Sequence, residues 1–399
     1  MSWSPQQDAA LQAVRRWIKQ PRGRTMSRAE QVYYLAGYAG TGKTTLAKEL
    51  AEGVAGGAVF GAFTGKAALV LRTKGCEGAS TIHSLIYQVD EEDEDSFGGS
   101  PKFKLSPFSP VKTAGLVVID ECSMVDEELG ADLLSFGTKV LVLGDPAQLP
   151  PVRGQGYFTA GTPDTMLTEV HRQAAENPII RMSMDVRMGK PLTLGRYGES
   201  LVIDRAQLEA ENVMAADQVL VGMNRTRRNW NRRIRQLKGH DPAAPQVGDR
   251  LVCLKNDRAK QLLNGGLWTV QGVGAGGGRR RAIAGATPLL GGAPPVAVPD
   301  AKGRLVLRVV SEDEALAKPR TVSVLPQFFD GTDEAAIPRE AKKGTSEFTY
   351  GYALTTHKSQ GSQWNDVLVL DEGGTFREDA TRWRYTAITR AAERLTVVL

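Results

Sequence analysis

The sequence has few cysteines and no apolar run long enough to span a membrane. Cys76, Cys122 and Cys253 lie far apart, and no C-x-x-C pair occurs. This spacing indicates neither a disulfide framework nor a zinc site. No run approaches the ~18 apolar residues of a membrane helix, and the first residues lack a basic segment followed by an apolar one. We therefore expect a cytoplasmic protein that is neither secreted nor inserted in a membrane.

The composition is that of a globular chain with a basic bias. Hydrophobic residues make up 41% and charged residues 24% of 399 residues, and the net charge is +5. A chain of this length is expected to form about two to four domains. The basic bias is compatible with a nucleic-acid partner, but it is too common among proteins to identify one.

A glycine-rich segment, Gly37–Thr45, fits the pattern G-x-x-x-x-G-K-[ST]. An apolar strand-like segment, Val32–Ala36, precedes it, and a helical one, Leu46–Leu50, follows it, which is the context of a phosphate-binding loop. The glycines let backbone N–H groups turn inward toward a β-phosphate. Lys43 is expected to reach the phosphates, and the Thr44 hydroxyl to hold Mg²⁺. The sequence thus predicts a nucleotide site containing Gly37, Gly40, Thr41, Gly42, Lys43, Thr44 and Thr45.

Two later apolar segments place further polar groups beside this loop. Leu116–Ile119 reads as a buried parallel strand and ends in Asp120 and Glu121. We expect Asp120 to bind Mg²⁺ and Glu121 to act as the general base that activates the attacking water. The following buried strand leads into a proline-rich loop, where Gln148 is placed to contact the γ-phosphate.

Other polar residues are candidates for base recognition, catalysis or backbone contacts. Gln7 lies near the start of a predicted helix, where its amide is suited to reading the adenine edge. Arg172 is a candidate for stabilising transition-state charge, and His171 for stacking on the base. Asn224 ends a predicted strand and is a candidate backbone contact for a nucleic acid. The segments around Thr64 and Thr81 are either such contacts or ordinary β–α turns.

Two regions interrupt the α/β pattern. Over 87–113, alternation and prolines indicate a hairpin insertion, with Phe97, Phe103 and Phe108 as candidate strand-separating wedges or as packing at its base. Over 246–347, short alternating segments with glycine turns are typical of an all-β insertion.

A basic helix is predicted over 225–238, and no acidic residue interrupts it. Trp230, Ile234 and Leu237 are predicted to share its buried face, which leaves the arginines on the other faces. These arginines form either a solvated flank or a phosphate-binding surface, and the sequence favours neither.

The order of the motifs resembles that of superfamily 1 helicases. The glycine-rich loop is followed by Asp120-Glu121, a Gly-Asp-Pro-x-Gln-Leu-Pro-Pro run over 144–151, His171-Arg172-Gln173 and a Tyr-Thr-Ala-Ile-Thr-Arg-Ala run over 385–391. The Thr-His-Lys-Ser-Gln-Gly run over 356–361 resembles the RecD-like branch.

This resemblance implies how several residues act. Two RecA-like domains are expected to clamp ATP, with Arg172 and Arg390 as an arginine pair. Gln363 stands where many relatives carry an acid, so its ribose contact would use a neutral acceptor. The implied DNA contacts are Thr64, Lys66, Thr81, His83, Thr356, His357 and Lys358.

The predicted fold is α/β, with two RecA-like P-loop NTPase motor domains, a hairpin insertion in the first and a Src-homology-3-like barrel in the second. The predicted boundaries are 1–86 and 114–176 for the first motor domain, 87–113 for the hairpin, 177–245 and 348–399 for the second motor domain, and 246–347 for the barrel.

The predicted function is that of an ATP-dependent DNA helicase that uses Mg²⁺ and moves 5′-to-3′ on single-stranded DNA. The expected partners are single-stranded and forked DNA and replication or recombination proteins, and a monomer is favoured. Two alternatives stay open: an RNA-directed or protein-remodelling motor of the same architecture, and an ATP-gated nucleic-acid clamp.

Overall fold

The computed structural model divides the chain into two compact units. The first contains Met1–Ser200, Gln360–Gln363 and Phe376–Ala392, and the second contains Leu201–Ser359, Trp364–Thr375 and Glu393–Leu399. The structure describes residues 3–21, 26–89, 103–150, 156–170, 176–240, 244–257, 260–274, 284–285, 294–312 and 318–399. Among these residues, none of the helices combines the length and apolar character that a membrane crossing requires.

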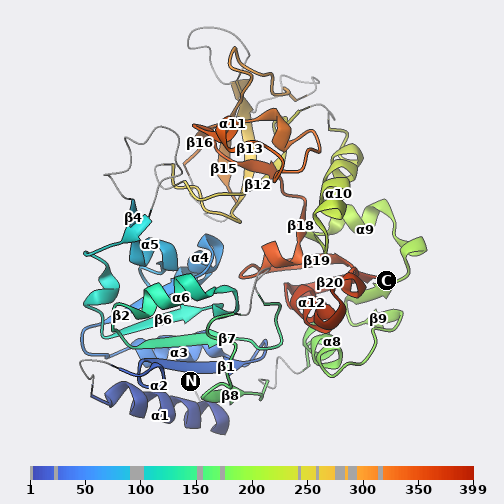
Figure 1. The fold of residues 1–399 in the computed structure, drawn as a ribbon. Helices are drawn as coiled ribbons and strands as arrows, with labels where there is room; N and C mark the ends of the chain where they lie inside the picture. The colour runs from blue at the N-terminus through green and yellow to red at the C-terminus, as the bar shows by residue number, and fades with distance from the viewer. Residues whose placement is uncertain are drawn as a thin grey trace. The chain divides into compact units, whose positions relative to one another are not determined.

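The first unit is built on a parallel sheet (Figure 1). Its strands lie in the order β3-β2-β6-β7-β1-β8, with every adjacent pair parallel. Their bounds are β1 Val32–Gly37, β2 Ala58–Ala62, β3 Ser80–Thr81, β6 Leu116–Asp120, β7 Val140–Gly144 and β8 Thr165–Leu167. This order brings the carboxyl ends of β1, β6 and β7 side by side, where the loop, the acids and Gln148 were expected.

Helices cover both faces of this sheet because β1 alternates its buried side chains between them. Tyr33 and Leu35 join the core that contains α1 (Pro5–Lys19) and α3 (Lys43–Ala51). Val32, Tyr34 and Ala36 join the core on the other face. That core holds α5 (Ile82–Ile86) and α6 (Glu127–Leu134). The two cores explain why the strand is buried along its whole length.

Both ends of α1 are fixed by polar contacts. At its start, Ser4 and Gln7 form a capping box that satisfies backbone N–H groups. At its end, the buried Lys139 ammonium donates to the carbonyls of Trp17, Ile18 and Gln20 at 2.5, 3.3 and 2.8 Å. A cation at a helix C-terminus also interacts favourably with the helix dipole.

The remaining elements of the first unit follow the same chain order. They are α2 Arg28–Gln31, α4 Gly65–Thr73, β4 Tyr87–Val89, β5 Phe103–Leu105, α8 Pro178–Arg187, β9 Gly195–Tyr197 and α12 Ala380–Ile388. Strands β4 and β5 pair antiparallel, so a short two-stranded ribbon leaves the end of α5. The predicted division placed α12 in the second motor domain, whereas its residues lie in the first compact unit.

The second unit contains its own sheet. Strands β18 (Ala353–Thr355), β11 (Gln218–Val221) and β19 (Trp364–Leu370) lie side by side and parallel. Strands β20 (Ala391–Val398) and β10 (Ser200–Ile203) continue the order. Helices α9 (Ala210–Ala215) and α10 (Asn224–Leu237) flank this sheet.

An antiparallel sheet occupies the rest of the second unit, in the order β16-β15-β13-β12-β17. The bounds are β12 Arg250–Cys253, β13 Leu267–Val273, β14 Ala284–Gly285, β15 Leu305–Ser311, β16 Arg320–Val324, α11 Arg339–Lys342 and β17 Phe348–Tyr350. Strand β17 pairs with β12 although the predicted insertion ended at 347. Leu251 and Val309 of this sheet share one hydrophobic core with Val219 and Leu368 of the parallel strands.

The buried face of α10 differs from the predicted one. Ile234 is buried as expected, but Leu237 is 38% exposed, and Arg227, Asn231 and Arg235 occupy the buried face. Arginines can lie there because acids from the antiparallel region reach them: Arg227 pairs with Glu334, and Arg235 binds both oxygens of Asp249 at 3.0 and 3.1 Å. Buried charges need such partners.

Candidate nucleotide site at the carboxyl edge of the first sheet

The glycine-rich loop connects β1 to α3 and has the backbone that a phosphate cradle requires. Gly40 and Gly42 adopt φ values of 80° and 78°, a region that side chains disfavour. Gly37 is constrained by space, since a Cβ there would lie 2.6 Å from the Thr41 hydroxyl. The loop therefore needs glycine at these positions, and it directs the start of α3 toward the edge of the sheet.

The side chain of Lys43 folds over the loop. Its ammonium donates to the carbonyls of Gly37 at 2.6 Å and Tyr38 at 3.0 Å. Both acceptors are neutral, and the lysine lines a cleft of the first unit. An ammonium held in this way lies where phosphate oxygens can replace the carbonyls as its acceptors.

The two residues expected to hold Mg²⁺ are brought together. The Thr44 hydroxyl donates to a carboxylate oxygen of Asp120 at 3.0 Å. No cluster of three or more His, Cys, Asp or Glu side chains suited to a metal occurs in the described part of the chain. Magnesium, however, keeps several waters and takes one or two protein oxygens together with substrate phosphates. A hydroxyl and one carboxylate beside a phosphate loop fit that donor set.

Glu121 has an unusual backbone and a perturbed carboxyl. Its φ of 53° and ψ of 44° lie in the left-handed region, which a non-glycine residue seldom adopts. Its N–H donates to Asp120 at 2.8 Å. Burial raises the pKa of the Glu121 carboxyl, while the guanidinium of Arg390 opposes this shift and the Asp120 carboxylate reinforces it. A carboxyl with a raised pKa in a cleft is suited to proton transfer.

These groups line one cleft of about 410 Å³ in the first unit. Gln148 faces it, and its side-chain oxygen has no hydrogen-bond partner among the described residues. Arg390 enters after α12; its guanidinium donates to the carbonyls of Thr386 and Ser362 at 3.1 and 3.2 Å. The lining is Ala39–Thr45, Ala67, Val70, Lys74, Asp120, Glu121, Gly144, Asp145, Gln148, Gly361–Gln363, Thr389 and Arg390.

The two candidate base and ribose contacts differ in position. Gln363 lines the cleft and is exposed. Gln7 is buried: its amide N–H donates to the Thr41 carbonyl at 3.0 Å, and its oxygen accepts from the Ser4 backbone at 3.1 Å. Gln7 therefore ties the start of α1 to the phosphate loop, and its use in reading adenine stays a prediction.

The candidate DNA contacts of the first unit lie at helix starts. The hydroxyls of Thr64 and Thr81 cap α4 and α5 by accepting from Ala67 and Ser84 at 3.2 and 3.1 Å. His83 is exposed on α5, and its ring lies 5.2 Å from that of Tyr87, centroid to centroid. Lys66 lies in the first turn of α4 and is half-buried.

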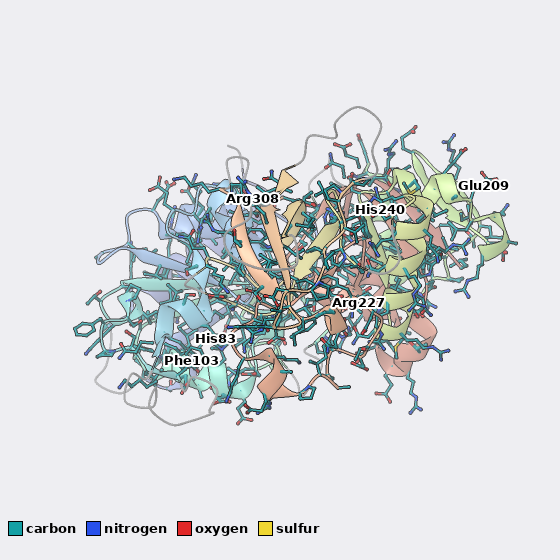
Figure 2. The ribbon with its side chains drawn as sticks, turned by 90° about the horizontal axis from the view of Figure 1, so that it is seen from above. His83, Phe103, Glu209, Arg227, His240 and Arg308 are labelled. Carbon is teal, nitrogen blue, oxygen red and sulfur yellow. The ribbon has the colours of Figure 1, made fainter. Side chains whose placement is uncertain are left out.

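An aromatic series continues from α5 into the antiparallel ribbon. Tyr87 of β4 lies 6.4 Å from Phe103 of β5, centroid to centroid, and Figure 2 shows the first and last members, His83 and Phe103, in the same region. Phe103 is 53% and Phe108 89% exposed. Phe97 lies outside the described residues, so the structure places two of the three candidate wedges.

The candidate contacts of the second unit cluster at the ends of β11 and β18. Thr356 is buried, with its hydroxyl 3.3 Å from the Val221 carbonyl, and His357 is half-buried. Burial lowers the pKa of the Lys358 ammonium, and the charge of Arg227 lowers it further. Asn224 begins α10, is exposed and accepts from the Arg227 guanidinium at 3.3 Å.

Two predicted site residues, His171 and Arg172, lie outside the described residues. Conversely, the structure brings Tyr385 and Asp145 into the site, although the sequence singled out neither as functional. The Tyr385 hydroxyl lies 2.6 Å from Asp145 and 2.9 Å from the Ala39 nitrogen. Both residues stand inside the recognised motif segments, which is the signal that could have identified them.

Two family descriptions match the chain. The one described as "AAA domain" covers residues 21–207, and the one described as "UvrD-like helicase C-terminal domain" covers residues 350–398. A curated relative is the "ATP-dependent RecD2 DNA helicase" of Deinococcus radiodurans, 30% identical over 389 residues, which span 90% of this chain and 46% of the relative. The chain thus spans about half the length of this relative.

Solved structures share the fold over almost the whole chain. The crystal structure of Pif1 helicase from Candida albicans superposes with a TM-score of 0.54 at 18% identity, covering 100% of this chain and 94% of that one. Pif1 helicase from Bacteroides, in complex with ADP-AlF3 and single-stranded DNA, gives 0.52 at 16% identity, with 99% and 92% covered.

Proposed function

This chain belongs to the RecD- and Pif1-like superfamily 1 helicases, and from that membership we propose that it is an ATP-dependent DNA helicase. The observation that carries the proposal is the cleft of the first unit. There Lys43, Glu121, Gln148 and Arg390 line one space beside a glycine-rich phosphate loop. A site for binding alone would not need a buried carboxyl together with an arginine.

We assign each group one task in hydrolysis. The N–H groups at the start of α3 and the Lys43 ammonium bind the β- and γ-phosphates. Thr44 and Asp120 hold Mg²⁺, which supplies neutralisation of phosphate charge when it is bound. Glu121 accepts a proton from the attacking water, Gln148 orients that water, and Arg390 stabilises charge that develops on the phosphate oxygens.

The finer parts of the proposal extend the resemblance to the whole protein. We propose that two RecA-like motor domains close on ATP and open after hydrolysis, that Arg172 joins Arg390 on the phosphates, and that the antiparallel region forms a Src-homology-3-like barrel. Single-stranded DNA would be held by the predicted contacts at Thr64, Thr81, His83 and Lys358. Support comes from the positions of these residues at strand ends and helix starts.

ATP turnover in different nucleic acids tests this function. Hydrolysis is measured with no nucleic acid, with single-stranded DNA and with single-stranded RNA of the same sequence. We expect the strongest stimulation by DNA, and loss of turnover in Lys43→Ala because the phosphates lose their cation. Stimulation by RNA alone would instead indicate an RNA-directed motor, and an absence of turnover in every condition would indicate an ATP-gated clamp.

A further inference from the structure

The hydroxyl of Tyr385 joins three motifs of the first unit. It donates to a carboxylate oxygen of Asp145 at 2.6 Å and accepts from the backbone nitrogen of Ala39 at 2.9 Å. Ala39 belongs to the phosphate loop, Asp145 begins the loop after β7, and Tyr385 lies in α12. The tyrosine is 1% and the aspartate 3% exposed, so water does not compete for these bonds.

The chemistry of a phenol makes this contact directional. A hydroxyl has one proton to donate, and Asp145 receives it; the Ala39 N–H then occupies an acceptor position of the same oxygen. Burial and the nearby Asp145 carboxylate raise the pKa of the Tyr385 hydroxyl, so it remains a donor. Both bonds form together only while the phosphate loop, the Asp145 loop and α12 keep their relative positions.

The contact lies close to two groups assigned to hydrolysis. On the Asp145 side, Gln148 donates its backbone N–H to the Asp145 carbonyl at 3.1 Å. On the α12 side, the next residue, Thr386, accepts from the Leu149 N–H at 2.9 Å, and its carbonyl accepts from the Arg390 guanidinium at 3.1 Å. A shift of α12 against the loop after β7 would therefore move both Gln148 and Arg390.

A second contact holds the same arm of the phosphate loop. The Arg187 guanidinium at the end of α8 lies 3.4 Å from the centroid of the Tyr38 ring. Helix α8 packs against α12. The backbone of Tyr38 and Ala39 is therefore held by two helices that contact each other, while Lys43 holds the Gly37 and Tyr38 carbonyls from the other end of the loop.

We propose that Tyr385 is a positioning residue that makes the placement of Gln148 and Arg390 depend on the backbone position of the phosphate loop. This inference rests on the proposed function, because it assigns Tyr385 a part in ATP hydrolysis. The tyrosine does not contact the reacting atoms. It acts through Asp145 and Thr386 on groups that stabilise the transition state, so its loss affects turnover more than nucleotide binding.

The test is Tyr385→Phe, which keeps the buried ring and removes only the hydroxyl. We expect kcat for DNA-stimulated ATP hydrolysis to fall about tenfold or more while KM for ATP changes less than about threefold. Binding of ADP–aluminium fluoride, which imitates the transition state, should weaken by a similar factor to kcat. Asp145→Asn, which leaves the tyrosine in place and makes its acceptor neutral, should give the same separation of kcat from KM if Tyr385→Phe fails to fold.

Tyr34→Phe is the matched control. Tyr34 is also buried in the first unit, but its hydroxyl has no hydrogen-bond partner among the described residues, so its removal should leave kcat unchanged. Unchanged kcat in Tyr385→Phe, equal effects on kcat and KM, or the same loss in Tyr34→Phe would each overturn the inference while the proposed function stands. A wild-type protein without turnover in any nucleic acid would overturn the proposed function itself.

Discussion

At the scale of single residues, Glu121 combines a strained backbone with a buried carboxyl. The left-handed conformation costs free energy, on the order of 1–3 kcal/mol for such outliers, and it turns the side chain away from the path of β6. Burial raises its pKa above the ordinary value of 4.5. Because a general base must be deprotonated, the sign is clear: activity is present above the raised pKa and is lost as the pH falls through it.

Glu121→Gln tests this role directly. The amide keeps the shape of the side chain but accepts no proton, so ATP and DNA binding should remain while kcat falls about 100-fold or more. The loss of wild-type activity toward low pH should be centred above 4.5, and Glu121→Gln should lack it. Nucleotide-binding titrations and pH–rate profiles measure both. Glu127→Gln is the control, since Glu127 is exposed at the start of α6; wild-type kcat in Glu121→Gln would refute the assignment.

At the scale of elements, α10 uses its arginines in two ways. Arg227 and Arg235 are buried in ion pairs, and Figure 2 labels Arg227 on this helix. Arg225, Arg232 and Arg233 are exposed and have no ion-pair partner among the described residues. Uncompensated like charges on one helix destabilise it slightly. The exposed side is therefore the part of α10 suited to phosphates.

Replacing Arg225, Arg232 and Arg233 by Gln tests α10 as a DNA contact. If each arginine contacts one phosphate, the slope of log K against log salt for single-stranded DNA should become shallower by about 0.7 per arginine. The measurement is fluorescence anisotropy over a series of salt concentrations. Replacing Arg205, Lys302 and Lys318, which are also exposed in the second unit, removes the same charge and should leave the slope unchanged. Equal slopes in both triple variants would mean that α10 is only a solvated flank.

The ribbon of β4 and β5 gives a second prediction at this scale. Phe103 and Phe108 are exposed, and an exposed aromatic ring can stack on a separated base. Alanine at the wedge residue should reduce duplex unwinding several-fold and leave DNA-stimulated ATP hydrolysis intact. Strand-displacement and ATP assays on the same preparations give the ratio. Leu105→Ala, on the same strand and 38% exposed, is the non-aromatic control. If Phe103→Ala, Phe108→Ala and Phe97→Ala all unwind normally, the ribbon is not the separating element.

At the scale of the whole molecule, local patterns predicted the α/β fold and the phosphate loop, and the likeness to Pif1 structures confirms a RecA-like core. The pairing of Thr44 with Asp120 followed from the rule that parallel strands end at one edge. The bond between Ala39 and Tyr385 joins residues 346 positions apart, and no local pattern indicates it. The buried face of α10 was predicted incorrectly because the acids that accept Arg227 and Arg235 come from distant segments.

The direction of movement is a property of the whole molecule, because each step needs ATP hydrolysis and at least two places that hold the strand. The resemblance to the RecD-like branch predicts 5′-to-3′ movement. Duplexes with a single-stranded tail at either the 5′ or the 3′ end should therefore differ, with rapid unwinding only from the 5′ tail. The measurement is the rate of strand separation at equal protein concentration, with a blunt duplex and Lys43→Ala as controls. Because Lys43→Ala removes ATP-driven movement but not the DNA contacts, any separation it retains reflects binding alone. ATP-dependent unwinding that is faster from the 3′ tail would contradict the predicted polarity and leave the helicase proposal intact.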